Sequence, residues 1–107
     1  MPTLLFNGKL TGVSFEPAKT NVLKLRALLP DKVQLFLHHD VSNAFDKAAL
    51  RVMATTTEGT LEIGWIPAFV KEKADWITEG LVSLKVVLIA VDGFDGKYGV
   101  RVQVLKL

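Results

Sequence analysis

Short segments with an apolar residue at every second position recur along this chain. In residues 33–38, for example, Val33, Leu35 and Leu37 alternate with residues that would lie on the opposite face. This is the period of a β-strand that buries one face. Turn-forming residues such as Asp92–Gly96 separate the segments, as is typical of antiparallel hairpins. The strands expected on this basis cover residues 9–15, 33–38, 49–54, 60–66, 81–91 and 100–104.

Two further segments have helical spacing. A helix that ends near Leu29 would begin after Thr20 or Asn21, either of which could cap it, and Pro30–Asp31 would close it. The stretch Val22–Leu25 fits a strand equally well.

The second helical segment runs from Ala68 to Glu79. Pro67 suits its first turn, and Gly80 stands where a helix commonly ends. Several strands with two short helices predict a mainly β fold, a small and partly closed barrel of about six strands. The chain has 107 residues and no internal linker, so we expect residues 1–107 to form a single domain.

The residue types present argue against most catalytic and metal-binding classes. Cysteine is absent, which removes disulfides and thiolate metal sites. His38 and His39 are adjacent and would point to opposite faces of a strand, so they would not chelate one ion. No nucleophile elbow, phosphate-binding glycine loop or paired catalytic carboxylates are recognisable. We therefore expect no enzyme activity, no cofactor and no metal.

Charge and hydropathy bear on partners and location. The net charge is +2, which permits contact with phosphate without demanding it. The N-terminus does not have the pattern of a signal peptide, and the longest apolar run, Val86–Val91, is too short to cross a bilayer. We expect a soluble cytoplasmic protein without a membrane partner, either a monomer or a weak homodimer.

Two motifs carry the most specific signal. Asp40–Val52 contains an acidic residue, then Asn43, then the pair Phe45-Asp46, and leads into a segment with Ala and Val. Gly59–Pro67 ends in Ile-Gly-Trp-Ile-Pro, and a weaker element is Gly-Val-Ser-Phe at residues 12–15. Over roughly residues 8 to 80 the chain resembles the HIRAN domain family, whose signature has these parts in this order.

The resemblance implies a barrel with two helices that recognises DNA. HIRAN domains are associated with single-stranded or damaged DNA ends, either alone or fused to helicase-like motors. We therefore expect a non-catalytic DNA-binding module in DNA repair or replication, with DNA as the partner and a helicase or nuclease as a possible protein partner.

The loop motif has a structural and a functional interpretation. The side-chain oxygen of Asn43 can accept hydrogen bonds from loop N–H groups, so a structural role is favoured for it. Phe45 would offer a ring to a base, a contact of about 1–3 kcal/mol, and Asp46 would accept a hydrogen bond from a sugar hydroxyl. The resemblance implies that Phe45 and Asp46 lie in the DNA-binding pocket.

Four more residues are candidates for the same pocket. Phe15 and Trp65 would stack on bases, although the alternation around Trp65 suits the core equally well. Arg51, just after the loop, and Lys71, just after Pro67, would flank the pocket and bind phosphate. The remaining basic residues, among them Lys47, Lys73, Lys97 and Arg101, are expected on solvated faces.

One departure from the family pattern motivates an alternative. Ser14 stands where many members carry a basic residue, and Glu16 where they carry a second aromatic residue. A carboxylate in a DNA groove would repel phosphate. The alternative is a protein-interaction or assembly module that kept the barrel and lost DNA binding.

Overall fold

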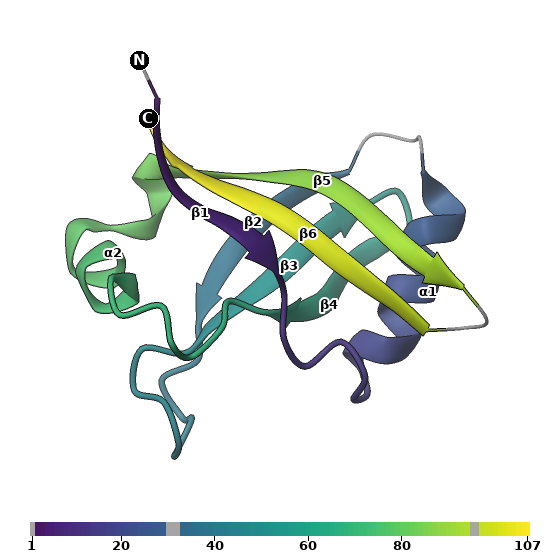
Figure 1. Cartoon of the computed structure of the whole chain (residues 1–107), viewed down its shortest axis with the longest axis horizontal. Coiled ribbons are helices and arrows are strands. Elements are labelled where there is room, and N and C mark those ends of the chain that lie inside the picture. The colour runs from purple at the N-terminus through teal and green to yellow at the C-terminus, as the bar shows by residue number, and fades with distance from the viewer. Residues whose placement is uncertain (1, 30–32, 95–96) are drawn as a thin grey trace.

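The computed structural model of the chain describes residues 2–29, 33–94 and 97–107. Within these ranges, six strands form one antiparallel sheet in the order β1-β6-β5-β2-β3-β4 (Figure 1). The expectation of a mainly β fold with two helices is confirmed. The elements are β1 (Thr3–Lys9), α1 (Ala18–Leu28), β2 (Gln34–His39), β3 (Leu50–Thr56), β4 (Gly59–Trp65), α2 (Lys73–Glu79), a 3-10 turn η1 (Leu81–Ser83), β5 (Leu84–Phe94) and β6 (Lys97–Lys106).

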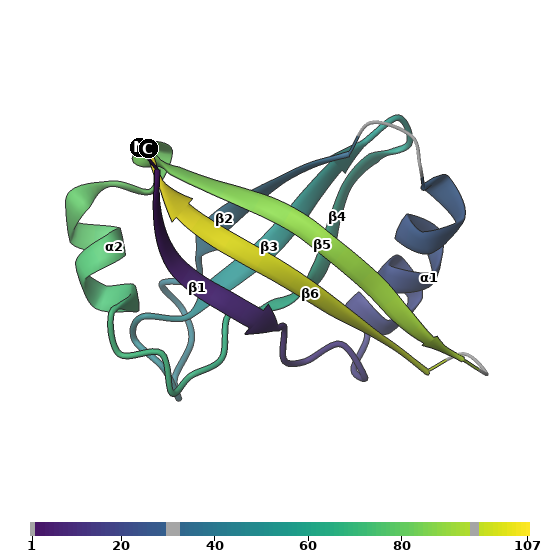
Figure 2. The same cartoon turned by 45° about the horizontal axis from the view of Figure 1, so that its top comes forward.

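The sheet is curled into two three-stranded arms, β1–β6–β5 and β2–β3–β4, that lie across one another (Figure 2). Strands β2 and β5 are paired at one position, Leu35 with Val86. At the opposite edges, Thr11 and Trp65 form an isolated bridge in which each N–H donates to the other carbonyl at 2.9 Å. The barrel is therefore only partly closed, as the sequence predicts.

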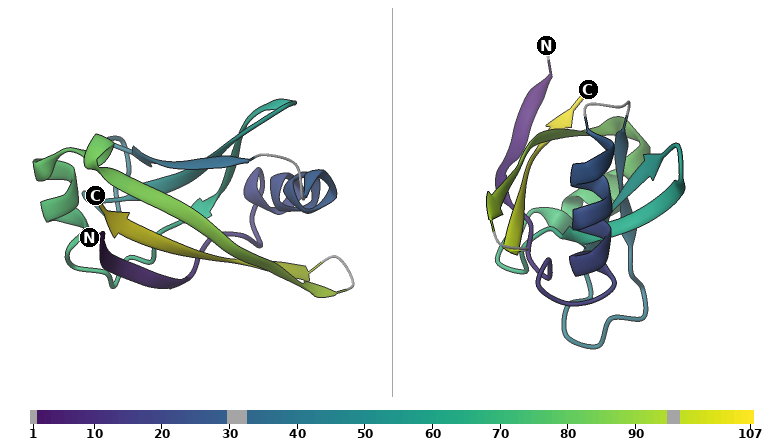
Figure 3. Two further views of the ribbon diagram at one scale, coloured as in Figure 1. Left: turned by 90° about the horizontal axis from the view of Figure 1, so that it is seen from above. Right: turned by 90° about the vertical axis from the view of Figure 1, so that its right-hand side faces the viewer.

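The core lies between the two arms. Alternate residues of the strands point inward, among them Val52, Val102 and Val104, which are fully buried. Helix α1 lies across one end of the barrel between the arms (Figure 3) and adds Leu25 to the core. Asn21 on this helix donates from Nδ2 to the carbonyl of Glu62 at 2.9 Å, which satisfies a backbone group on the edge strand β4. The helix thus covers both the core and an exposed strand edge.

The first strand differs from the prediction. It begins at Thr3 and ends at Lys9, so the expected strand over residues 9–15 is wrong. Gly12 has φ of +74°, a conformation that interrupts an extended strand, and the N–H of Phe15 donates to the Gly12 carbonyl at 3.2 Å. Residues beyond Thr11 therefore form a turn that leads into α1.

The first helix starts earlier than expected. It begins at Ala18, and the carboxylate of Glu16 accepts hydrogen bonds from the N–H and the hydroxyl of Thr20. Glu16, rather than Thr20 or Asn21, thus satisfies a free N–H of the first turn. The strand alternative for Val22–Leu25 is wrong, and the predicted stop at Pro30–Asp31 lies outside the described residues.

The second helix is shorter than expected. It begins at Lys73, so the prediction that it starts at Ala68 is wrong. The N–H of Val70 donates to the Pro67 carbonyl at 3.1 Å in a turn that buries Val70. A regular helix from Ala68 would present a different face to the core. Gly80 ends the helix with φ of +97°, as predicted.

Both predicted hairpins are confirmed, with different bounds. Thr56 pairs with Gly59, so the β3–β4 turn holds only Thr57 and Glu58. The β5–β6 ladder reaches Phe94 and Lys97, and the two residues between them lie outside the described ranges. The residues of η1 replace the first part of the strand expected from residue 81.

Candidate functional site

An open groove of about 750 Å³ lies at the end of the barrel where the β2–β3 loop, the turn after β1 and the end of β4 meet. Four of the six residues predicted to contact DNA line it: Phe15, Phe45, Asp46 and Trp65. We call this hollow the aromatic groove. Its other lining residues are Thr11, Asn43, Ala49, Ile66 and Ala68.

Short polar side chains hold the β2–β3 loop in shape. The Asn43 Oδ1 atom accepts hydrogen bonds from the N–H groups of Phe45 and Asp46, both at 2.9 Å. One carboxylate oxygen of Asp40 accepts from the N–H and the hydroxyl of Ser42, at 3.2 and 2.8 Å. These side-chain oxygens accept hydrogen bonds from backbone N–H groups of the loop, which have no neighbouring strand to pair with. Asn43 therefore has a structural position, with its oxygen fully used by the loop.

Phe45 stands at the tip of this bend and is 100% exposed. Phe15, on the turn after β1, is 73% exposed. Burial of one such ring stabilises a fold by roughly 1.5–3 kcal/mol, and the fold forgoes that gain at both positions. Exposed aromatic rings that line one groove are a feature of surfaces that bind something apolar.

Trp65 is half-buried, so its position lies between the two that the sequence left open, the core and the surface of the groove. Its backbone forms the bridge to Thr11, and its side chain lines the groove. The guanidinium carbon of Arg51 lies 5.0 Å from the centroid of the indole ring, in a cation–π contact. Part of the ring is thus engaged by the protein, and the rest borders the groove.

Asp46 is anchored by an ion pair that has no signal in the sequence. One carboxylate oxygen pairs with the Nζ atom of Lys73, and the other accepts the Ala48 N–H at 3.0 Å. The Lys73 side chain is only 2% exposed, and that of Asp46 is 25% exposed. The hydrogen bond from Lys73 lowers the pKa of Asp46, against the opposing effect of burial, so the carboxylate stays ionised.

The expectation of a solvated surface position for Lys73 is therefore wrong. Lys73 stands among Lys71, Glu72 and Asp75, a neighbourhood that resembles an exposed helix face. It is buried because α2 begins at Lys73, which directs its side chain towards the β2–β3 loop.

The structure does not bring Arg51 and Lys71 into the groove. The Arg51 Nη2 atom lies 3.3 Å from Oδ2 of Asp40, and its Nε atom lies 3.0 Å from Oε1 of Glu62. The second contact is an ion pair without a directed hydrogen bond. Lys71 is exposed in the turn before α2 and is not among the lining residues. Arg51 is thus neutralised by two carboxylates, and neither Arg51 nor Lys71 is among the residues that line the groove.

The described residues contain no group of three or more histidine, cysteine, aspartate or glutamate side chains that could hold a metal ion. The helices described here are also too short and too polar to cross a membrane.

Comparison of the chain with protein-family models, with curated proteins and with solved structures found no match. The resemblance to HIRAN domains therefore rests on the motif residues alone.

Proposed function

We propose that this protein is a non-catalytic module that binds single-stranded DNA, with an unpaired or terminal nucleotide held in the aromatic groove. The observation that carries the proposal is the convergence of Phe15, Phe45 and Trp65 with the Asp46 carboxylate on one open hollow. These residues come from three separate parts of the chain.

The groove has the chemistry and the size for a nucleotide. Aromatic rings stack on bases with about 1–3 kcal/mol per base, and every base offers a face for stacking. A volume of about 750 Å³ is in the range of small-molecule pockets. Phe45 and Phe15 have exposed faces that need no rearrangement before a base can stack on them. This supports binding with little sequence preference.

Asp46 supports recognition of a strand end. A carboxylate accepts about four hydrogen bonds, and two of these positions are used by Lys73 and the Ala48 N–H. The remaining capacity suits a free sugar hydroxyl, whereas a terminal phosphate would be repelled by the ionised group. We therefore propose a preference for strand ends with a free hydroxyl over ends with a phosphate.

The test uses fluorescence anisotropy with labelled single-stranded oligonucleotides. Phe45→Ala is expected to weaken binding about 5- to 150-fold, the equivalent of one lost stacking contact. Because Phe45 is fully exposed, the variant should unfold at the same temperature as the native protein. Phe69→Ala is the matched control, since Phe69 is 79% exposed and is not among the residues lining the groove.

Two results would contradict the proposal. One is undetectable binding of single-stranded DNA by the native protein, and the other is equal binding by native protein and Phe45→Ala. The end preference is tested separately, with oligonucleotides that differ only in a terminal hydroxyl or phosphate and with a blunt duplex.

The second candidate is a protein-interaction module. Val41 and Phe45 on the β2–β3 loop are both highly exposed, and Phe69 follows the groove residue Ala68. Exposed apolar side chains of this kind also suit a protein partner. Light scattering distinguishes the two functions: a stable dimer that Phe45→Ala disrupts and that ignores DNA would favour this second candidate.

A further inference from the structure

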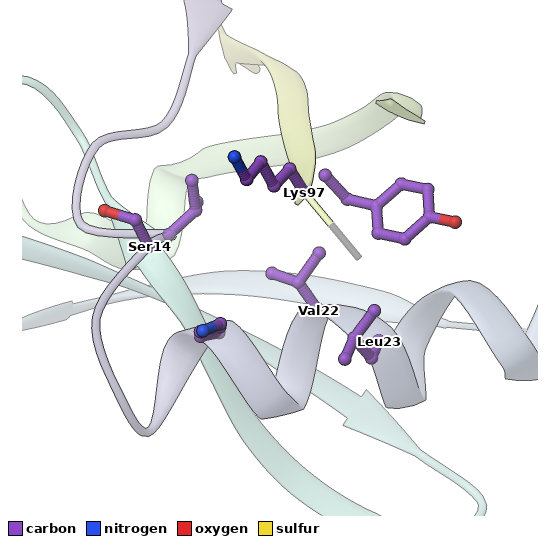
Figure 4. Close-up of a pocket in the computed structure, with 7 residues that line it drawn as sticks. Ser14, Val22, Leu23 and Lys97 are labelled. Carbon is purple, nitrogen blue, oxygen red and sulfur yellow. The ribbon is translucent and has the colours of Figure 1, made fainter. Parts of the chain in front are cut away.

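A second hollow, of about 370 Å³, lies between α1, the turn after β1 and the start of β6. Figure 4 shows Ser14, Val22, Leu23 and Lys97 around it. The described residues that line it are all different from those of the aromatic groove. We call it the lysine-rimmed pocket, and its lining residues are Val13, Ser14, Lys19, Val22, Leu23, Lys97 and Tyr98.

One side of this pocket is apolar. Val22 is buried against the core, while Leu23, its neighbour on α1, is 40% exposed. The ring of Tyr98 lies opposite on β6, and the guanidinium carbon of Arg26 is 4.6 Å from its centroid. This cation–π contact limits the positions that the tyrosine ring can adopt. The pocket therefore has a defined apolar wall.

The rim is positively charged. Lys19 belongs to the first turn of α1, and Lys97 is the first residue of β6. Neither forms an ion pair with another described residue. Glu16 carries an opposing charge that interacts with Lys19, and its carboxylate accepts hydrogen bonds from the N–H and the hydroxyl of Thr20.

The start of α1 does not add to this charge, because the carboxylate of Glu16 already accepts the N–H of Thr20 in the first turn of the helix. An anion at the rim would therefore meet the two ammonium groups of Lys19 and Lys97. Ser14 also lines the pocket, and its hydroxyl group can donate a hydrogen bond.

We propose that the lysine-rimmed pocket binds a small organic anion with an apolar body. The apolar body packs against Leu23 and the Tyr98 ring, and the anionic group lies between Lys19 and Lys97. A pocket with an apolar wall and a few convergent polar groups is the usual form of a small-molecule site. This site is separate from the proposed DNA-binding groove, and neither proposal depends on the other.

The test uses two fluorescent probes that differ by one charge. 8-Anilino-1-naphthalenesulfonate carries a sulfonate on the same ring system that N-phenyl-1-naphthylamine presents without charge. The native protein should bind the sulfonate about tenfold more tightly than the neutral probe. The double variant Lys19→Gln/Lys97→Gln should bind both probes equally and retain the affinity for the neutral one.

The control variant Lys24→Gln/Lys85→Gln loses the same charge from exposed positions outside the pocket and should behave as the native protein. Phe45→Ala should also leave sulfonate binding unchanged, because Phe45 lines the other hollow.

The proposal is overturned by any of three results. These are no sulfonate binding by the native protein, unchanged discrimination in the double lysine variant, and loss of sulfonate binding in Phe45→Ala. If the double lysine variant does not fold, Leu23→Glu takes its place. That change adds a negative charge at a part-exposed position, and it should abolish sulfonate binding while circular dichroism shows an intact fold.

Discussion

At the scale of single residues, the Asp46–Lys73 pair fixes a residue of the β2–β3 loop that lines the aromatic groove. The two residues are 27 positions apart, and the pair ties the β2–β3 loop to α2. The two members are not equivalent, because the Lys73 side chain is 2% exposed and that of Asp46 is 25% exposed. An unpaired charge costs more where water cannot reach it.

The two truncations should therefore differ in stability. Asp46→Ala leaves the buried ammonium group of Lys73 without its partner, and the free energy of unfolding should fall by about 3–5 kcal/mol. Lys73→Met leaves a carboxylate that water partly solvates, with an expected loss of about 1–3 kcal/mol. Urea denaturation measures both, with Phe45→Ala as the control near zero. A larger loss for Lys73→Met would contradict the burial argument.

The same pair predicts acid sensitivity. Lys73 holds the pKa of Asp46 below its ordinary value of 3.8, so the unfolded chain takes up a proton more readily than the folded one. The stabilisation is complete above about pH 4 and is lost as the pH falls through the lowered pKa. Asp40 contributes in the same direction, mainly through the hydroxyl of Ser42.

The melting temperature of the native protein should therefore fall from about pH 4 downwards. Asp46→Asn should start lower and show a shallower fall, because it lacks the titrating group. Melting temperatures recorded from neutral pH to about pH 3 test this. Parallel curves for the two proteins would show that Asp46 is not the group involved.

At the scale of elements, β4 connects barrel closure to the groove. Gly64 has φ of +148°, and a Cβ atom there would lie 3.0 Å from both the Leu10 Cβ atom and the Thr11 carbonyl oxygen. This close approach lets the Thr11–Trp65 bridge form, and both bridge residues line the groove. Gly64 thus allows the barrel to close at the bridge, and it thereby positions two residues of the candidate site.

Gly59 provides a matched comparison for Gly64. Its φ is +114°, yet a Cβ atom there would meet nothing within 4 Å. Both alanine variants should incur backbone strain of about 1–3 kcal/mol, but only Gly64→Ala adds a steric contact. Gly64→Ala should therefore be the less stable variant in urea denaturation, and it should also weaken single-stranded DNA binding. Equal stabilities would argue against a close contact at the bridge.

At the scale of the whole molecule, charge predicts how DNA binding should respond to salt. The net charge is +2, and none of the described residues lining the aromatic groove is Lys or Arg. Binding should then depend more on stacking than on phosphate contacts. Each phosphate neutralised on a single strand contributes a slope of about −0.7 to the logarithm of affinity against the logarithm of salt.

With one or two phosphate contacts, the slope should be shallower than about −1.5. Anisotropy titrations between about 50 and 200 mM salt measure it. A much steeper slope would place most of the binding on basic residues outside the groove.

The sequence supports correct predictions where the physical cause is local. The alternation of apolar residues over 33–38 is the property of a single strand with one buried face. Strand β2 (Gln34–His39) is displaced from this range by one residue. Gly80 ends α2 because a positive φ is a property of the residue itself. Asn43 is a loop residue because its side chain reaches N–H groups only two and three positions ahead.

Predictions fail where the cause is a distant part of the chain. Helix α2 begins late because Val70 enters the core through a turn. Arg51 is engaged by carboxylates on two other segments, so its phosphate role could not be judged from its place beside the loop. The burial of Lys73 depends on Asp46, which lies 27 residues away. The charges next to Lys73 in the sequence therefore do not predict it.

Alternation, turn residues and composition can be read from the chain, and they determined a mainly β fold with two helices. The sequence also supplied the aromatic and acidic side chains of the candidate site. Only the tertiary structure decided that Phe15, Phe45 and Trp65 share one groove. The reason is that the groove exists through the closure of the barrel at the Thr11–Trp65 bridge, which joins residues 54 positions apart. Strand periodicity is a property of neighbours, whereas closure depends on how the two arms pack as a whole.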